Sequence, residues 1–367
     1  MTHNRSCAED MENIQNTTKR GSVDPRLFHI LECPRCHSGL ELEADRLFCR
    51  LEHSYPIVNG VPVFVLPEKE QTIGVASASC DAAANAQGDP LYLKTIGVSD
   101  IERAGIKRRW AQSGHIDGVD PAISYLVGAT SGLGYTNLIG QLKIYPIPKI
   151  PVQPGPGKLL LDIGCNWGRW SISAARKGWY VVGIDPSLGA IMAARRAFHS
   201  ERHVMFVCGD ARFLPFKNNT FDCVFSYSVI QHFSEEDAET TLAEIGRTLA
   251  NDGFSRIQMA HRGGLRSTYI RSRSDYFNGG VFRVRYWSID KLKMAFDKHI
   301  GPSTVVPEAF GGLGLLTDDW PIVSIKAKVL IVISLFLKNS ARFIRPLIRI
   351  ADSVYVISTK RPSKTPG

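Results

Sequence analysis

Three aspartates stand at the ends of successive apolar runs in the middle of the chain, a spacing that could build one ligand site. Asp162 closes LLLD, Asp185 closes YVVGID and Asp210 closes HVMFVCGD. Continuous apolar runs are typical of buried parallel strands, and the carboxyl ends of such strands meet at one edge of a sheet. We therefore expect the three carboxylates to lie around a common ligand.

The turn after Asp162 indicates what kind of ligand this is. It reads Asp-Ile-Gly-Cys-Asn-Trp-Gly, with Gly164, Asn166 and Gly168 at points where a tight turn needs little bulk or a positive φ. A dinucleotide site uses G-x-G-x-x-G, and here the second glycine is replaced by Asn166 and the third by arginine. A carboxylate at the strand's end repels phosphate and attracts an ammonium group. The pattern favours a cofactor that carries an amino acid.

Residues 158–261 resemble class I S-adenosylmethionine-dependent methyltransferases of the type 11-like group. The resemblance implies that Asp185 binds the ribose hydroxyls and that Asp210 lies beside the adenine. Ser226, Tyr227 and His232, in FSYSVIQHF, would face the methyl group or the acceptor. The cofactor-binding residues implied are Asp162, Gly164, Cys165, Asn166, Gly168, Asp185, Pro186, Asp210, Ala211 and Ser226.

Simpler interpretations remain open for these residues. Asp185 and Asp210 could each be a helix cap or a turn residue. His232 is the candidate general base, and the alternative is a residue that only surrounds the site. Cys165, Cys208 and Cys223 are expected to fill space beside strands.

A second group of residues, near the N-terminus, has the chemistry of a metal site. Cys33, Cys36, Cys49 and His53 form C-x2-C and C-x3-H pairs, as tetrahedral zinc prefers. Four protein ligands leave no open position, so the zinc would be structural. Residues 25–67 are too few to fold by apolar burial alone, and a metal would stabilise them. The alternatives are unpaired thiols and, as a competing ligand, His37.

This N-terminal module resembles two kinds of zinc ribbon. One heads bacterial large-subunit rRNA guanine-N1 methyltransferases, and the other is the small zinc-ribbon partner that activates tRNA and protein methyltransferases. The resemblance rests on CPRC, FC and HSYPIVNGVPV. It implies structural zinc in a small β module.

The elements that must position these residues follow from the pattern along the chain. Apolar strand runs alternate with helical runs near 169–177, 188–198 and 235–249, which predicts an α/β fold with a Rossmann-like, doubly wound, mostly parallel sheet. Ser234 with Asp237 predicts the cap of the third helix. A further helix, again capped by a serine, Ser288, is expected at 286–299, and a closing strand at 353–359.

The remaining segments complete the domain organisation. Residues 1–24 are expected to be a disordered tail, and 68–157 a linker followed by a helical and proline-rich connector. The methyltransferase domain is expected at 158–360, with a C-terminal insertion at 262–350.

Composition and charge limit the protein's location and partners only broadly. The net charge is +9 and there are eight cysteines in 367 residues without a secretory h-region, which favours reduced thiols and a cytoplasmic location. Residues 323–350 combine the run VLIVISLFL with lysines and arginines, and a run of this length is too short to cross a bilayer. This segment is either a basic helix lying on an anionic membrane, or a buried or oligomer-forming helix.

These patterns lead to one main functional expectation. The chain is expected to be an enzyme that methylates a small molecule or a glycan- or lipid-type acceptor with S-adenosylmethionine. The alternatives are an rRNA or tRNA base methyltransferase, with RNA as partner, and a non-catalytic cofactor-binding adaptor.

Overall fold

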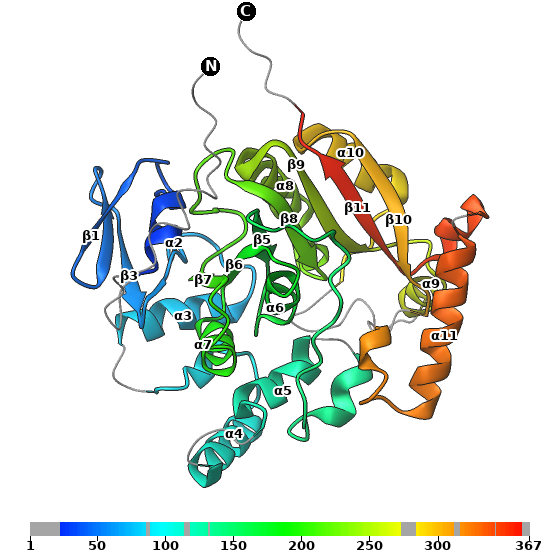
Figure 1. Cartoon of the computed structure of the whole chain (residues 1–367), viewed down its shortest axis with the longest axis horizontal. Helices are drawn as coiled ribbons and strands as arrows, with labels where there is room; N and C mark the ends of the chain where they lie inside the picture. Colours follow the sequence, from blue (N-terminus) through cyan, green and yellow to red (C-terminus); the bar gives the residue numbers. More distant parts are fainter. Residues whose placement is uncertain are drawn as a thin grey trace, which may run out of the picture.

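The computed structural model describes residues 23–85, 89–113, 118–130, 133–272, 284–311, 316–341 and 343–361. A small β module at the N-terminus lies beside a larger α/β body (Figure 1). The expected disordered tail, 1–24, falls outside the described residues except at its last two positions.

The central sheet has seven strands in the order β10-β11-β9-β8-β5-β6-β7. Its strands are β5 (Leu159–Ile163), β6 (Tyr180–Asp185), β7 (Val204–Cys208), β8 (Phe221–Tyr227), β9 (Leu249–Ala260), β10 (Ser303–Ala309) and β11 (Ser353–Thr359). β5 to β9 pair in parallel, and β11 runs antiparallel to both of its neighbours. This confirms the predicted α/β fold with a mostly parallel sheet.

Alternation along β5 divides the core between the two faces of the sheet. Leu159, Leu161 and Ile163 face one core, which also receives the apolar sides of α8 (Glu235–Thr248) and α10 (Ile289–His299). Leu160 faces the other, where it packs with Trp170 of α6 (Arg169–Ala175). α7 (Leu188–Ala197) packs against β6 and β7. Helices therefore cover both faces, as a doubly wound sheet requires.

The expected caps form as the sequence predicts. The Ser234 hydroxyl accepts the Asp237 N–H at 3.0 Å and begins α8, and the Ser288 hydroxyl accepts the Lys291 N–H at 3.3 Å and begins α10. Each satisfies a backbone donor that the first helical turn leaves without a partner.

The N-terminal module is a four-stranded antiparallel sheet preceded by the short helix α2 (Pro25–Ile30). Its strands are β1 (Leu40–Glu43), β2 (Arg46–Cys49), β3 (Ser54–Val58) and β4 (Val61–Pro62). Val63 continues from β4 into a parallel bridge with Cys208, and the Phe64 N–H donates to the Cys208 carbonyl at 2.7 Å. The module therefore covers the outer edge of β7, which would otherwise expose unpaired backbone groups.

Apolar side chains of the module belong to the same core as the sheet. Leu27, Leu31 and Phe64 are almost completely buried together with β-strand residues of the large body. A partly buried ion pair, Arg247 to Glu32 at 2.7 Å, connects α8 to this module. The two parts are therefore packed as one unit.

The first part of 68–157, expected to be a linker, contains a packed helix. Residues 74–84 form the helix α3 (Gly74–Ala84), followed by η1 (Leu93–Thr95), α4 (Asp100–Ser113), α5 (Pro121–Thr130) and η2 (Leu133–Leu138). The small residues that suggested a linker allow close packing, since Ala76, Ser79 and Ala83 are buried. Composition alone does not separate a flexible linker from a closely packed helix of small residues.

The C-terminal part also departs from its expected description. β10 and α10, inside the expected insertion 262–350, belong to the sheet and its covering layer, so the added elements are α9 (Leu265–Arg271), η5 (Thr317–Asp319), α11 (Ile325–Ser340) and η6 (Arg345–Ile350). β10 escaped prediction because it is an edge strand containing Pro307. Among the helices of the described residues, none combines the length and apolarity needed to span a bilayer.

Candidate functional site

The carboxyl ends of β5, β6, β7 and β8 open into a cavity of about 530 Å³, a size suited to a small-molecule ligand. The structure brings most of the expected site residues to its wall. These are Gly164, Cys165, Asn166, Asp185, Pro186, Asp210, Ala211, Tyr227 and His232.

The turn after β5 has the positive φ angles that its sequence predicts. Gly164, Asn166 and Gly168 have φ of +71°, +48° and +82°. A Cβ on Gly164 would lie 2.2 Å from Val229 Cγ2, so the close approach of these two loops requires glycine at this position. The turn thus brings its backbone up to the cavity, whose wall also includes Cys165, Asn166 and Trp167.

Asp185 connects two turns around the cavity. One carboxylate oxygen accepts the Asn166 N–H at 2.9 Å, and the other accepts the Ser187 N–H at 2.8 Å. Burial raises the pKa of Asp185 to about 6, although both backbone donors favour the charged form. Each oxygen retains a lone pair for a ligand hydroxyl.

Asp162 lies elsewhere than expected. It is 1% exposed, is absent from the cavity wall, and accepts a hydrogen bond from the Ser171 hydroxyl at 2.6 Å. It therefore fixes α6 behind the turn, and direct contact with a ligand ammonium is not the geometry found. Burial, together with the charge of Asp185, raises the pKa of Asp162 to about 7.

Asp210 reaches the cavity already paired. Its two oxygens accept from the Arg212 guanidinium, with the shortest contact at 2.6 Å, and Arg212 also pairs with Asp237 at 2.8 Å. The Arg212 guanidinium further donates to the Glu70 carbonyl at 2.7 Å. Asp210 is thereby held rigidly between α8 and the connector.

Two further expected residues do not line the cavity. Ser226 is fully buried within the sheet, where its hydroxyl donates to the Ile163 carbonyl at 3.0 Å. Gly168 lies at the N-cap of α6 and shapes the turn from behind. Ser226 lies one layer away because successive side chains on a strand point to opposite faces of the sheet.

The wall contains polar groups that the sequence did not indicate. Gln231 and Gln258 are 6% and 4% exposed, and their Oε1 atoms have no hydrogen-bond partner among the described residues. Ser228, just before Gln231 on the chain, has a φ of +64°, which is unusual for a residue with a side chain. A buried amide without a partner is costly, so this part of the wall is suited to a ligand that donates hydrogen bonds.

A buried cation also faces the cavity. The Arg169 guanidinium donates to the Tyr135 hydroxyl at 3.1 Å and lies 3.8 Å from an Asp319 carboxylate oxygen. Burial raises the pKa of Asp319. These three residues come from α6, η2 and η5, so only the tertiary fold brings them together.

The connector forms one side of the cavity, with Ile73, Val75, Ile96 and Gly97 in its wall. The buried Ser79 hydroxyl donates to the Pro186 carbonyl at 2.7 Å and accepts the Leu188 N–H at 3.1 Å. Thr95 makes similar contacts with the start of α7, accepting the Gly189 N–H at 2.7 Å. These contacts fix the turn that follows Asp185. No sequence motif signals this role, because the contacts join residues about a hundred positions apart.

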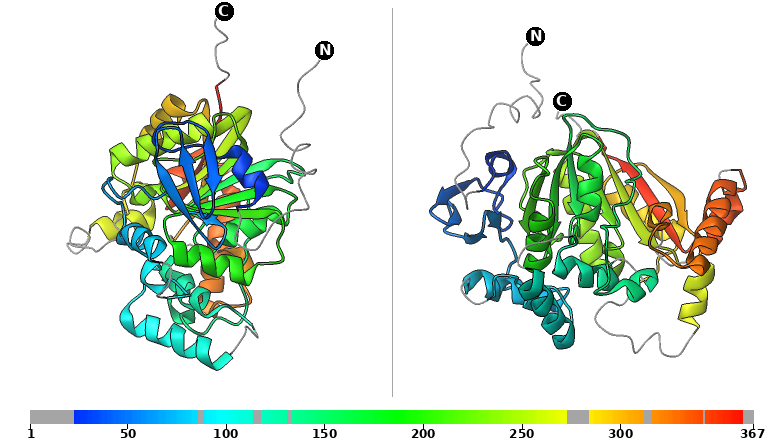
Figure 2. Two further views of the ribbon diagram at one scale, coloured as in Figure 1. Left: turned by 90° about the vertical axis from the view of Figure 1, so that its left-hand side faces the viewer. Right: turned by 60° about the horizontal axis from the view of Figure 1, so that its bottom comes forward.

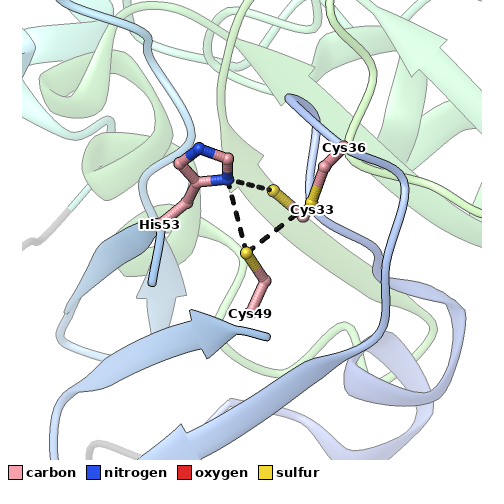
Figure 3. A group of neighbouring side chains, drawn as sticks. All are labelled: Cys33, Cys36, Cys49 and His53. Carbon is pink, nitrogen blue, oxygen red and sulfur yellow. Dashed lines mark hydrogen bonds between the residues drawn. The ribbon is translucent and has the colours of Figure 1, made fainter. Parts of the chain in front are cut away.

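The four expected metal ligands converge in the N-terminal module (Figure 3). Their ligand atoms all lie within 4.8 Å of one another. His53 Nδ1 is 3.5 Å from Cys33 Sγ and 3.4 Å from Cys49 Sγ, and Cys36 Sγ is 3.7 Å from Cys49 Sγ. A tetrahedral site with metal–sulfur bonds of about 2.3 Å has edges of about 3.5 to 3.8 Å. The residues present therefore fit a metal ion of the zinc type.

Neighbouring groups support this cluster. Tyr55 Oη is 3.1 Å from Cys33 Sγ, Ser38 Oγ is 3.1 Å from Cys36 Sγ, and Arg35 donates to Tyr55 Oη at 3.1 Å. Such outer contacts orient thiolate ligands and offset their charge. His37 Nδ1 lies 2.6 Å from Glu32 Oε1, and among the described residues His37 is not part of the ligand cluster.

Comparison with known proteins identifies part of the chain. Residues 160–253 match a family model described as a methyltransferase domain. A demethylmenaquinone methyltransferase of Corynebacterium kroppenstedtii is 33% identical over 102 residues, which cover 28% of this chain and 42% of that protein. The chain thus spans less than half the length of this relative.

Two other similarities are to a protein that matches a short segment of the chain and to a solved structure. The UPF0434 protein MS0934 of Mannheimia succiniciproducens is 49% identical over 49 residues, which cover 12% of this chain and 80% of that protein. Among solved structures, phosphoethanolamine N-methyltransferase 2 of Haemonchus contortus in complex with S-adenosyl-L-methionine has a TM-score of 0.39 and 20% identity, covering 58% of this chain and 50% of that one.

Asp162→Asn should change how stability depends on pH. Because the pKa of buried Asp162 is raised from 3.8 to about 7, the folded protein holds a proton that the unfolded chain loses. The retained proton contributes on the order of 2–4 kcal/mol to the free energy of unfolding. This contribution is fully present below about pH 4 and is lost as pH rises toward 7. Relative to wild type, the variant should therefore gain stability between pH 5 and 8, measured by urea unfolding. The exposed Asp252→Asn is the control, and a pH-independent difference for Asp162→Asn would contradict the assignment.

Ser79→Ala should weaken the contact between the connector and the turn after Asp185. The change leaves the Pro186 carbonyl and the Leu188 N–H without their partner, at a cost of roughly 2 kcal/mol. Urea unfolding should show this loss, whereas Ser77→Ala, on the exposed side of the same helix, should show almost none. Equal stability of the two variants would mean that these hydrogen bonds do not hold the turn.

Proposed function

We propose that this chain transfers the methyl group of S-adenosylmethionine to a small or lipid-type acceptor. Over 49 residues the chain belongs to the same family as the UPF0434 protein, and it carries a methyltransferase domain at residues 160–253. The observation that carries the proposal is the meeting of the Asn166 turn, Asp185 and Asp210 around one cavity. The name of the demethylmenaquinone relative supports an acceptor of this size class.

The cavity residues would form two groups, one that binds the cofactor and one that binds the acceptor. Asp185 would accept the ribose hydroxyls, while Asp210 and the Ala211 backbone would lie beside the adenine. The turn at Gly164, Cys165 and Asn166 would approach the amino-acid part of the cofactor. Because Asp162 is behind this turn, its role would be to hold the turn and α6 in position.

The acceptor would occupy the other end of the cavity. S-adenosylmethionine supplies an electrophilic methyl group, so the protein has mainly to align a nucleophile with the sulfur–carbon bond and exclude water. Gln231 and Gln258 would accept hydrogen bonds from the acceptor and orient it. His232, also in the wall, would take a proton where the nucleophile is a hydroxyl or a protonated nitrogen.

We further propose that Cys33, Cys36, Cys49 and His53 bind structural zinc. The tetrahedral edge lengths and the absence of an open ligand position support this role. Because the module shares its core with the sheet and covers the β7 edge, bound zinc would stabilise the whole body.

Asp185→Ala should abolish binding of S-adenosylmethionine. Loss of two charge-assisted hydrogen bonds to the ribose, worth about 1.5–3 kcal/mol each, weakens affinity by roughly 100-fold or more. Isothermal titration calorimetry measures this, and Asp185→Asn, which keeps one acceptor, should fall between. Exposed Asp100→Ala is the control. Thermal melts establish that the variants fold, and wild-type affinity in folded Asp185→Ala would refute the assignment.

Methyl transfer itself is tested with labelled S-adenosylmethionine and separate fractions of small molecules, lipids, glycans and RNA. Label in the small-molecule or lipid fraction supports the proposal, and label in RNA would favour base methylation. Cofactor binding without transfer to any fraction would point to a non-catalytic adaptor.

Cys49→Ser should remove most of the zinc from the purified protein. Serine is a poor ligand for zinc, and three remaining ligands bind the ion far more weakly. Elemental analysis should give about one zinc per wild-type chain and a large loss in the variant. His37→Asn, which changes a nearby histidine outside the cluster, should retain zinc. Full zinc in Cys49→Ser would refute the four-ligand site.

A further inference from the structure

Helix α11 turns its apolar side to solvent. Its inner stripe, Ile331, Ser334, Lys338 and the following Ala341, contacts the body: Ile331 is 4% exposed, Ser334 Oγ accepts the Phe310 N–H at 3.0 Å, and Lys338 pairs with Glu308 at 2.8 Å. These positions repeat at helical spacing and so lie on one side of the helix.

The opposite side of the helix is apolar and exposed. At the same spacing it presents Ile325, Val329, Val332, Ile333 and Phe336, which are 80%, 53%, 52%, 49% and 69% exposed. Two more large apolar residues follow, Phe343 at 88% and Ile344 at 54%. A helix on the surface of a globular protein normally has the reverse arrangement, with its polar side outward. We call these seven residues the α11 apolar face.

The charges around the α11 apolar face have one sign. Between residues 320 and 351 the chain has six lysines and arginines and no aspartate or glutamate. Lys326, Arg345 and Arg349 are exposed and form no ion pair with the described residues. Lys326 and Lys328 lie on either side of the apolar stripe by helical spacing.

Helices α9 and α11 lie at the same end of the molecule, opposite the N-terminal module (Figures 1 and 2). α11 packs against β10, and Arg266 of α9 donates to the Gly311 carbonyl just beyond β10 at 3.4 Å. Arg266, Ser267 and Ile270 of α9 line the cavity, while Leu265 and Tyr269, on its other side, are 58% and 60% exposed. Exposed apolar side chains therefore occur both on α11 and on a helix that forms part of the cavity wall.

We propose that the α11 apolar face docks the protein on the surface of an anionic lipid bilayer. The 16-residue helix would lie in the interface, with its apolar side among the acyl chains and its cations at the lipid phosphates. A second copy of the chain is a poorer occupant, because two such faces bring only like charges together. The length of α11, about 24 Å, suits a helix lying in the bilayer surface.

Vesicle flotation of the full-length chain tests this proposal. Wild type should float with phosphatidylcholine vesicles that contain phosphatidylglycerol, less so at high salt, and weakly with phosphatidylcholine alone. The double variant Ile333→Glu/Phe336→Glu should lower binding to anionic vesicles at least tenfold, and Lys326→Glu/Arg345→Glu should remove the salt-sensitive part.

The matched control is Ile101→Glu/Met294→Glu, which changes two residues that are 86% and 72% exposed on α4 and α10. It should bind like wild type.

The proposal is overturned if wild type does not bind anionic vesicles, or if Ile333→Glu/Phe336→Glu binds as well as wild type. Light scattering that shows a wild-type dimer and a monomeric Phe336→Glu, without vesicle binding, would assign the face to a second copy. Calorimetry with S-adenosylmethionine separates this outcome from failure of the proposed function, since docking variants should keep cofactor affinity.

Discussion

The carboxylate of Asp185 is the contact on which the cavity depends. It joins the turn after β5 to the turn before α7 through the N–H groups of Asn166 and Ser187. Both turns are held from outside as well, the first by Gly164 packing against Val229 and the second by Ser79 of α3. A carboxylate buried this deeply has a raised pKa, so its two backbone donors are needed to keep it available as an anion.

The N-terminal module and the connector belong to the body that contains this cavity. The module covers the β7 edge through Val63, and its apolar residues share the core of the sheet. The connector then passes from Glu70, whose carbonyl receives Arg212, to α3 and η1 at the wall of the cavity.

Helix α11 has little buried surface against the rest of the protein. Only Ile331 along its length is buried, so intramolecular packing contributes little to the helix, and the greater part of its apolar surface remains in water. Isolated helices of this length are only marginally stable in water. The contacts through Ser334 and Lys338 determine how α11 is oriented, and they turn its apolar side outward.

The sequence by itself determined the sheet, the four-ligand cluster and the acidic strand ends. Strand periodicity, Ser234 and Ser288 as caps, and the glycine-rich turn are local signals, and local backbone preferences were enough to form them. Only the tertiary structure decided that Asp162 and Ser226 face away from the cavity, that α3 and Gln258 form its wall, and that the apolar side of α11 points outward. The physical reason is that each of these depends on which side of an element meets a neighbour distant in sequence, and that choice is made by packing.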